Sequence, residues 1–114
     1  MWFALGAALL WGAAAGEAAS LCSGERPRWQ LRIEGDKARF SFPLPVEMEI
    51  PHRTTALGRE GADAPQAMTL IGARDTAIVI LTPGSCAGGT MGAVVLTQRA
   101  DDPVMLVGCC REVE

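Results

Sequence analysis

The sequence contains no tyrosine and one histidine, and aromatic residues make up only 5% of its 114 positions. It also lacks a basic excess, because 10 Lys and Arg side chains face 13 Asp and Glu side chains, and a nucleic-acid-binding surface needs such an excess. The chain is too short for two domains and has no polar low-complexity tract. These absences exclude a nucleic-acid binder, a two-domain protein and an intrinsically disordered chain.

The most prominent feature that is present is an uncharged apolar run from Trp2 to Ala15. A membrane-spanning helix needs roughly 20 apolar residues, whereas this run ends after 14, at Gly16 and Glu17. Its length fits the hydrophobic segment of a secretory signal peptide, and small residues follow it, as a cleavage site requires. We therefore predict a signal peptide over residues 1–19 and one exported domain over residues 20–114. A retained membrane anchor is the alternative, because no Lys or Arg precedes the run.

Beyond residue 19, apolar residues alternate with polar ones, which is typical of strands with one buried face. The alternating apolar positions are Trp29, Leu31 and Ile33, then Ala38, Phe40 and Phe42, then Val46, Met48 and Ile50. Further segments with the character of strands are 67–71, 76–82, 93–98 and 104–109. About seven short strands separated by Gly, Asp and Pro turns predict an all-β domain, a small antiparallel barrel or a sandwich.

Two of these segments have distinctive surroundings. Prolines at 43, 45 and 51 cannot donate to a ladder, so the strand from Val46 to Ile50 is predicted to be short or at an edge. The run from Ala77 to Leu81 is continuously apolar, which predicts a strand buried on both faces. We expect loops over residues 51–66 and 83–92, where Gly, Pro and polar residues gather.

All four cysteines follow the export segment: Cys22, Cys86, Cys109 and Cys110. An even number in a small exported domain predicts a disulfide framework. Adjacent residues of a strand point to opposite faces, so Cys109 and Cys110 are each expected to bond to Cys22 or Cys86, in an order that the sequence leaves open. The alternative is a redox or soft-metal function of the vicinal pair Cys109 and Cys110, although no Cys-x-x-Cys spacing supports it.

The segments around the cysteines resemble a family of small exported bacterial proteins described as membrane proteins or lipoproteins. The resemblance rests on the stretch from Cys22 through Gly24 and Pro27 to Trp29, on Cys86 in a Pro-Gly loop, and on Gly108-Cys109-Cys110-Arg111 near the end. This chain departs from the family pattern at Arg26, where the family has Glu, and in its shorter, less polar stretch after Cys86. The resemblance implies an exported location and a similar fold, and the family brings no established activity.

Few residues could support catalysis or metal binding. His52, the sole histidine, has no recognisable nucleophile partner and is expected at the surface. Ser85 belongs to neither a nucleophile-elbow nor a phosphate-loop motif. Glu47 and Glu49 share one strand face, where solvated carboxylates are expected rather than an acid–base pair. The methionines are expected to fill the core rather than to bind copper: Met48, Met68, Met91 and Met105. We therefore expect no catalytic residue, no metal site and no cofactor.

Trp29 begins the first alternating strand and is expected in the core. If it were instead exposed at a barrel mouth beside Arg26 and Arg28, these residues would form a surface for an anionic ligand or partner. We therefore take Arg26, Arg28 and Trp29 as the candidate ligand surface. The sequence predicts a monomeric, non-enzymatic binding or structural domain of the periplasm or cell envelope. Its partner would be a protein or small ligand, not a nucleic acid, and it would meet a membrane only through a retained signal segment.

Overall fold

The computed structural model describes residues 18–55, 58, 61, 63–99 and 101–113, to which the structural statements below refer. Apart from residues 18 and 19, the predicted signal peptide lies outside the described residues. The strands are β2 (Ala19–Glu25), β3 (Arg28–Glu34), β4 (Lys37–Ser41), β5 (Pro45–Thr55), β6 (Gln66–Gly72), β7 (Thr76–Cys86), β8 (Gly89–Arg99) and β9 (Asp102–Val113). Within these ranges no helix has the length and apolar character needed to cross a membrane.

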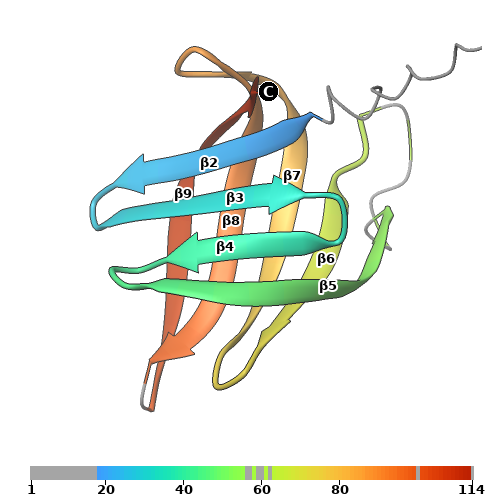
Figure 1. Cartoon of the computed structure of the whole chain (residues 1–114). Coiled ribbons are helices and arrows are strands. Elements are labelled where there is room, and N and C mark those ends of the chain that lie inside the picture. Colours follow the sequence, from blue (N-terminus) through green and yellow to red (C-terminus); the bar gives the residue numbers. More distant parts are fainter. Residues whose placement is uncertain (1–17, 56–57, 59–60, 62, 100, 114) are drawn as a thin grey trace, which may run out of the picture.

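The strands form a closed antiparallel barrel (Figure 1). Each strand pairs with its neighbour in sequence, and the first strand, β2, pairs with the last, β9. In Figure 1, β2 to β5 cross in front of β6 to β9, so the barrel has two facing layers. The all-β fold predicted from the alternation is confirmed, and of the two architectures left open the structure is the barrel.

The alternating apolar residues point into the barrel and fill it. The largest fully buried side chains are Phe40, Leu31, Leu70, Leu106, Val79 and Val95, together with Cys22 and Cys110. The interior of an eight-stranded barrel is just wide enough for side chains, and the apolar ones form a single cluster here. Burying one such side chain contributes about 1.5–3 kcal/mol to stability. The interior is therefore a stabilising core, and side chains fill the space that a ligand would need.

The strand around Met48 is long and central, so the prediction of a short or edge strand is wrong. β5 has 11 residues and pairs with β4 on one side and β6 on the other. Its prolines stand where a ladder tolerates them: Pro45 is the first residue, and Pro51 lies at a register shift between Glu49 and His52. The expected loop over residues 51–66 consequently begins only after Thr55.

The run from Ala77 to Leu81 is buried on one face only, so the prediction of two-sided burial is also wrong. Val79 is completely buried inside the barrel, whereas Ile78 is 47% exposed on its outside. A parallel strand would have helices over both faces, but an antiparallel sheet can leave one face to solvent. The outward-facing residues from Thr76 to Thr82 are accordingly exposed or half-buried.

The expected loop over residues 83–92 is a tight hairpin instead. β7 continues to Cys86, which pairs with Gly89 at the start of β8. Only Ala87 and Gly88 separate them, with positive φ values of 42° and 87°. These are the values of a type I′ hairpin turn, which has positive φ at both central residues and matches the twist of its strands. Gly88 adopts its positive φ at no steric cost.

The closing strand β2 is absent from the sequence prediction, because its burial does not follow a clean alternation. Two glycines allow β2 and β9 to approach each other closely. A Cβ atom on Gly108 would overlap the carbonyl oxygen of Ser23 and press on the Trp29 ring, and one on Gly24 would overlap the Trp29 indole and the carbonyl oxygen of Val107. The Trp29 Nε1–H donates to that same Val107 oxygen at 3.2 Å. The indole therefore occupies the space that the two missing side chains leave.

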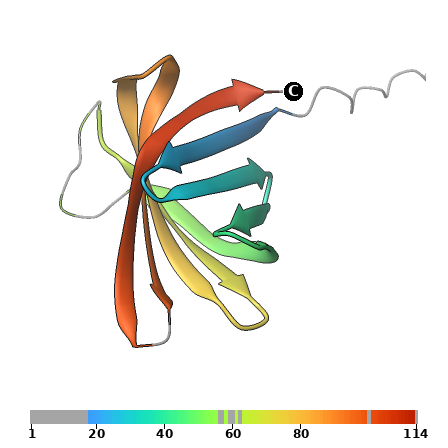
Figure 2. The same ribbon diagram turned by 90° about the vertical axis from the view of Figure 1, so that its left-hand side faces the viewer.

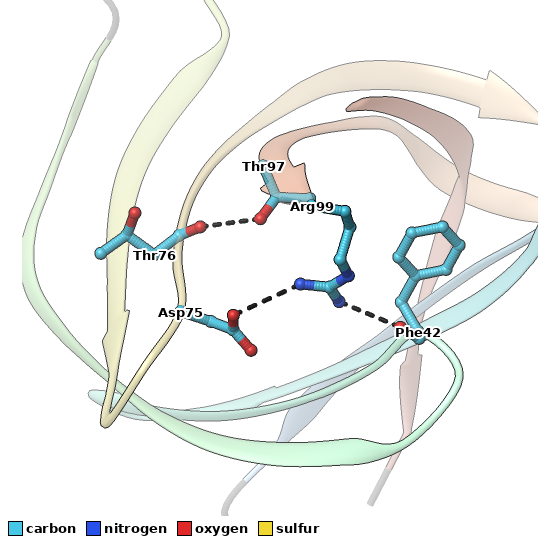
Figure 3. Close-up of polar contacts among 5 residues, drawn as sticks. All are labelled: Phe42, Asp75, Thr76, Thr97 and Arg99. Atoms are coloured by element: carbon cyan, nitrogen blue, oxygen red, sulfur yellow. Dashed lines mark hydrogen bonds and ion pairs between the residues drawn. The ribbon is translucent and has the colours of Figure 1, made fainter. Parts of the chain in front are cut away.

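Arg99, on β8, reaches toward the connections that precede β5 and β7 (Figure 3). Its guanidinium donates to the Phe42 carbonyl oxygen at 3.0 Å and to Asp75 Oδ1 at 3.4 Å. It also lies over the Phe42 and Phe40 rings, 5.1 and 5.8 Å from their centroids. Cation–π and charge-assisted contacts of this kind are stronger when partly shielded from water. Arg99 thus ties the β4–β5 and β6–β7 connections to β8.

The close approach at the closing strands can be tested by substituting Gly108. We expect Gly108→Ala to lower the free energy of unfolding by about 2 kcal/mol, since an added methyl group must displace the main chain of Ser23. Denaturant unfolding followed by Trp29 fluorescence measures the change.

The matched control is Gly92→Ala in β8, where the nearest atom to the added Cβ is 4.0 Å away. This variant should change stability by no more than about 0.5 kcal/mol. Equal unfolding midpoints for the two variants would contradict the close-packing account.

Candidate functional site

A surface groove of about 430 Å³ lies beside the β2–β3 hairpin, toward the end of β4. The residues that line it are Ser23, Gly24, Glu25, Arg28, Trp29, Gln30, Ser41 and Pro43. Because the β2–β3 and β3–β4 ladders are in register, Gln30 stands opposite Ser23 on one side and Ser41 on the other. The groove floor is therefore a row of three neutral polar side chains across three strands.

These three side chains are uncommitted to other parts of the protein. Ser23 and Gln30 are exposed and Ser41 is partly buried. In the described residues, no side-chain hydrogen bond is formed by any of the three, whereas hydroxyl and amide groups can both donate and accept. The row can therefore offer several hydrogen bonds to a bound group.

The sequence-predicted ligand surface lies at this groove, but its members differ in exposure. Trp29 is only 2% exposed, so the core assignment is confirmed and the alternative of an exposed tryptophan is wrong. Arg28 is open to solvent with its side chain 85% exposed, and it forms an ion pair with Glu25 at 3.7 Å. Arg26 is exposed in the turn between β2 and β3. Exposed ion pairs contribute at most about 1 kcal/mol, so Arg28 can exchange Glu25 for another anion.

Away from the groove, the polar side of the barrel carries exposed ion pairs between neighbouring strands. Glu47 accepts from Arg39, and Glu49 accepts from Lys37 at 3.5 Å, each across the β4–β5 ladder. Each carboxylate therefore has its own cation on the neighbouring strand. This arrangement fits the expected solvated face, and it does not present two free carboxylates to a common substrate as glycoside chemistry requires.

The disulfides join each vicinal cysteine to a different part of the barrel. Cys22 bonds to Cys110, its direct partner in the β2–β9 ladder, with Cα atoms 3.9 Å apart. Cys86, at the end of β7, bonds to Cys109 with Cα atoms 5.5 Å apart. Cys110 is buried inside the barrel and Cys109 lies on the other face of β9, partly buried. The predicted disulfide framework is confirmed, and the structure supplies the connectivity that the sequence left open.

The other candidate residues are scattered. His52 is exposed on β5, opposite Thr69 of β6, and so lies in a strand rather than the expected loop. Met48 and Met68 are buried in the core as expected, but Met105 is 64% exposed, so its assignment as core filler is wrong. Across the described residues, no three His, Cys, Asp or Glu side chains gather in a way that could hold a metal ion.

The fold and the groove together define a small, closed, disulfide-bonded antiparallel barrel with its accessible features on the outside. No family model, no curated protein and no solved structure matches the chain. The family resemblance drawn from the cysteine segments consequently stays a prediction.

The two disulfides should differ in their contribution to stability. Cys22 and Cys110 are 88 residues apart, and Cys86 and Cys109 are 23 apart. The loop-closure model then gives about 4.6 kcal/mol for the first bond and about 3.4 kcal/mol for the second. Paired Cys→Ala variants at 22/110 and at 86/109, compared by denaturant unfolding, should show the larger loss for the 22/110 pair. A larger loss for the 86/109 pair would show that loop length does not set the order.

Proposed function

We propose that this chain is an exported, non-enzymatic binding module that captures its partner on the outer surface of the barrel. Two disulfides are compatible with an oxidising compartment and are rare in the cytosol. The filled interior directs binding to the exterior. These features support a role in the periplasm or cell envelope, where a durable small domain is useful.

The observation that carries the proposal is the composition of the groove. Arg28 at its rim and Arg26 in the adjoining turn supply positive charge, and the Ser23, Gln30 and Ser41 side chains supply hydrogen bonds. An anionic group is recognised by this combination of a guanidinium and neutral donors. The ligand class that fits best is therefore a carboxylate or phosphate group on a small molecule or on an exposed protein segment.

The redox or soft-metal alternative has weaker support. It requires Cys109 and Cys110 as free or labile thiols, because the thiolate is the reactive and metal-binding form. Both cysteines are bonded, and the described part of the chain holds no free cysteine. A binding function needs no free thiol and is compatible with both disulfides.

Binding at the groove can be tested by NMR titration of the disulfide-bonded protein with a hexaglutamate peptide and, separately, with inorganic phosphate. We expect the Trp29 indole and Gly24 amide signals to shift. Replacing both Arg26 and Arg28 by Gln should weaken binding by roughly tenfold or more, because two charge-assisted contacts are lost.

The matched control replaces Arg74 and Arg111 by Gln, which removes the same charge from exposed positions outside the groove. This variant should bind as the unchanged protein does. An equal loss in both variants would show general charge attraction, and an absence of shifts with either probe would overturn an anion-binding groove.

A separate prediction concerns the N-terminus of the exported, mature protein. Ala19 is only 2% exposed and pairs with Val113 at the end of the β2–β9 ladder. The signal peptide predicted from the sequence ends at Ala19, and cleavage there would remove this pair. We therefore propose that cleavage falls on the N-terminal side of Ala19, so that the pair is kept. Non-reducing peptide mass spectrometry of protein exported from a bacterial host, with free thiols alkylated, reports both this terminus and the disulfides. A peptide that still begins at Met1 would favour the retained anchor.

A further inference from the structure

The two disulfides differ in their access to solvent. Cys22 and Cys110 are 0% and 1% exposed inside the barrel, whereas Cys86 and Cys109 are each partly exposed. Thiol–disulfide exchange needs a thiolate to reach one of the two sulfur atoms. The bond between Cys86 and Cys109 is therefore the one that an external thiol can attack, while burial protects the bond that closes the barrel.

The groove floor continues directly to this accessible disulfide. Cys109 stands opposite Ser23 in the β2–β9 ladder, and Ser23 stands opposite Gln30 in the β2–β3 ladder. Side chains that are directly opposite across a ladder share a face of the sheet, with Cβ atoms about 4.5–5.5 Å apart. Cys109 consequently stands at one end of the row of polar side chains that forms the groove floor.

The sulfur of Cys86 lies on the side of Cys109 that faces away from the groove. In Figure 2, the C-terminal part of β9 runs between the orange β7–β8 hairpin, which carries Cys86, and the blue strand β2. Cys86 Sγ lies 3.6 Å from the Gly108 carbonyl oxygen. That oxygen faces β8, because Cys22 and Cys110, with Cα atoms 3.9 Å apart, form a non-hydrogen-bonded pair and even-numbered residues of β9 then turn their main-chain groups away from β2.

This direction of the S–S bond suits an attack from the groove. A thiolate attacks one sulfur of a disulfide and expels the other, and it approaches in line with the bond that breaks. A thiol held beside Ser23 reaches Cys109 from the β2 side, with Cys86 as the leaving group on the β8 side. The protein disulfide is itself the oxidant in this step, so the exchange needs no other redox partner.

We propose that the groove captures a small peptide thiol that carries a carboxylate, as a mixed disulfide with Cys109. The inference rests on the proposed anion-binding function of the groove and adds a thiol to the ligand class. The ligand thiol loses its proton to water, its sulfur forms a bond to Cys109 Sγ, and the Cys86–Cys109 bond breaks. The electron pair of that bond stays on Cys86 Sγ, which takes up a proton from water.

The distance across the groove sets the size of this ligand. Gln30 lies two strands from Cys109, which is about 10 Å at the usual strand spacing. Arg28 lies two residues farther along β3, about 12 Å from Cys109 by the same spacing and the rise of a strand. A residue of extended peptide spans at most about 3.5 Å. A peptide of two or three residues therefore places its carboxylate within reach of the Arg28 side chain while its thiol meets Cys109.

The test exposes the disulfide-bonded protein to reduced glutathione, a tripeptide thiol with a carboxylate at each end, and separately to the neutral thiol N-acetylcysteine amide. The reaction is quenched early by alkylation and analysed by peptide mass spectrometry, and each rate is divided by that thiol's rate with a small neutral disulfide. We expect glutathione on Cys109, an alkylated Cys86 and an intact Cys22–Cys110 bond. At low salt the normalised rate should be roughly tenfold higher for glutathione, because complementary charge raises its local concentration.

Two single substitutions separate capture in the groove from general charge attraction. Arg28→Gln should remove the preference for glutathione and leave the rate with the neutral thiol unchanged. The matched control is Arg111→Gln, which removes an exposed cation two residues from Cys109 but outside the groove; this variant should keep the preference. Equal loss of preference in both variants, or equal normalised rates for the two thiols with the unchanged protein, would overturn the proposal.

The position of the mixed disulfide is an independent check. Glutathione on Cys86, with Cys109 alkylated, would mean attack from the side away from the groove, and two intact disulfides after prolonged incubation would mean that no thiol is captured. Either outcome overturns the thiol inference. The phosphate and hexaglutamate titrations are read separately: shifts of the Gly24 signal would leave the anion-binding groove standing, and their absence would overturn both proposals.

Discussion

The pairing of β2 with β9 is the contact on which the whole barrel depends. Without it the eight strands would be an open sheet with two long edges, and one side of the apolar core would lose its wall. Among the residues that the structure describes, five pairs make this contact. It is reinforced by a disulfide at the fourth of these pairs, by two glycines that permit close approach, and by the indole of Trp29.

Because this ladder is short, only part of β9 pairs with β2. Residues 109–113 pair with β2 and are joined to it by the Cys110 disulfide, whereas residues 102–108 pair with β8 alone. Trp29 lies at the junction between the two parts, where its Nε1–H donates to the Val107 carbonyl oxygen. The same residues that close the barrel thereby define where the pairing with β2 ends.

The outside of the barrel is divided into two chemically different sides. Strands β3 to β5 carry charged residues joined in ion pairs, such as Arg39 with Glu47. Strands β7 to β9 carry apolar residues that stand in register, Ile78 beside Leu96 and Leu96 beside Met105. The groove at the β2–β3 hairpin lies with the polar strands. The groove proposed to bind an anion and the row of exposed apolar side chains therefore lie on different strands of the barrel.

Sequence patterns located most of the strands but not their limits. The alternation at Trp29–Ile33 and Ala38–Phe42 identified the β3–β4 hairpin correctly. The period of two, which places alternate side chains on one face, is a local property of an extended chain. Pro51 misled the prediction for β5, since a register shift that accommodates a proline has no sequence signal. The exposed positions of Ile78 and Met105 were missed for a related reason. Which face of an apolar strand is covered depends on elements distant in the chain.

The candidate groove was only partly foreseen. Arg28 and Trp29 were singled out, but Ser23, Gln30 and Ser41 were not, because three polar residues on three strands carry no recognisable spacing. They meet only through the registers of the β2–β3 and β3–β4 ladders.

The sequence by itself determined the all-β class, the buried face of most strands and the need for each vicinal cysteine to bond elsewhere. These follow from a side-chain period of two, which is a local property of an extended chain. The tertiary structure decided the barrel, the pairing of Cys22 with Cys110, the groove and the unpaired edge of β9. Each of these depends on which strands, far apart in sequence, lie side by side and for how many residues, and a one-dimensional pattern does not contain that information.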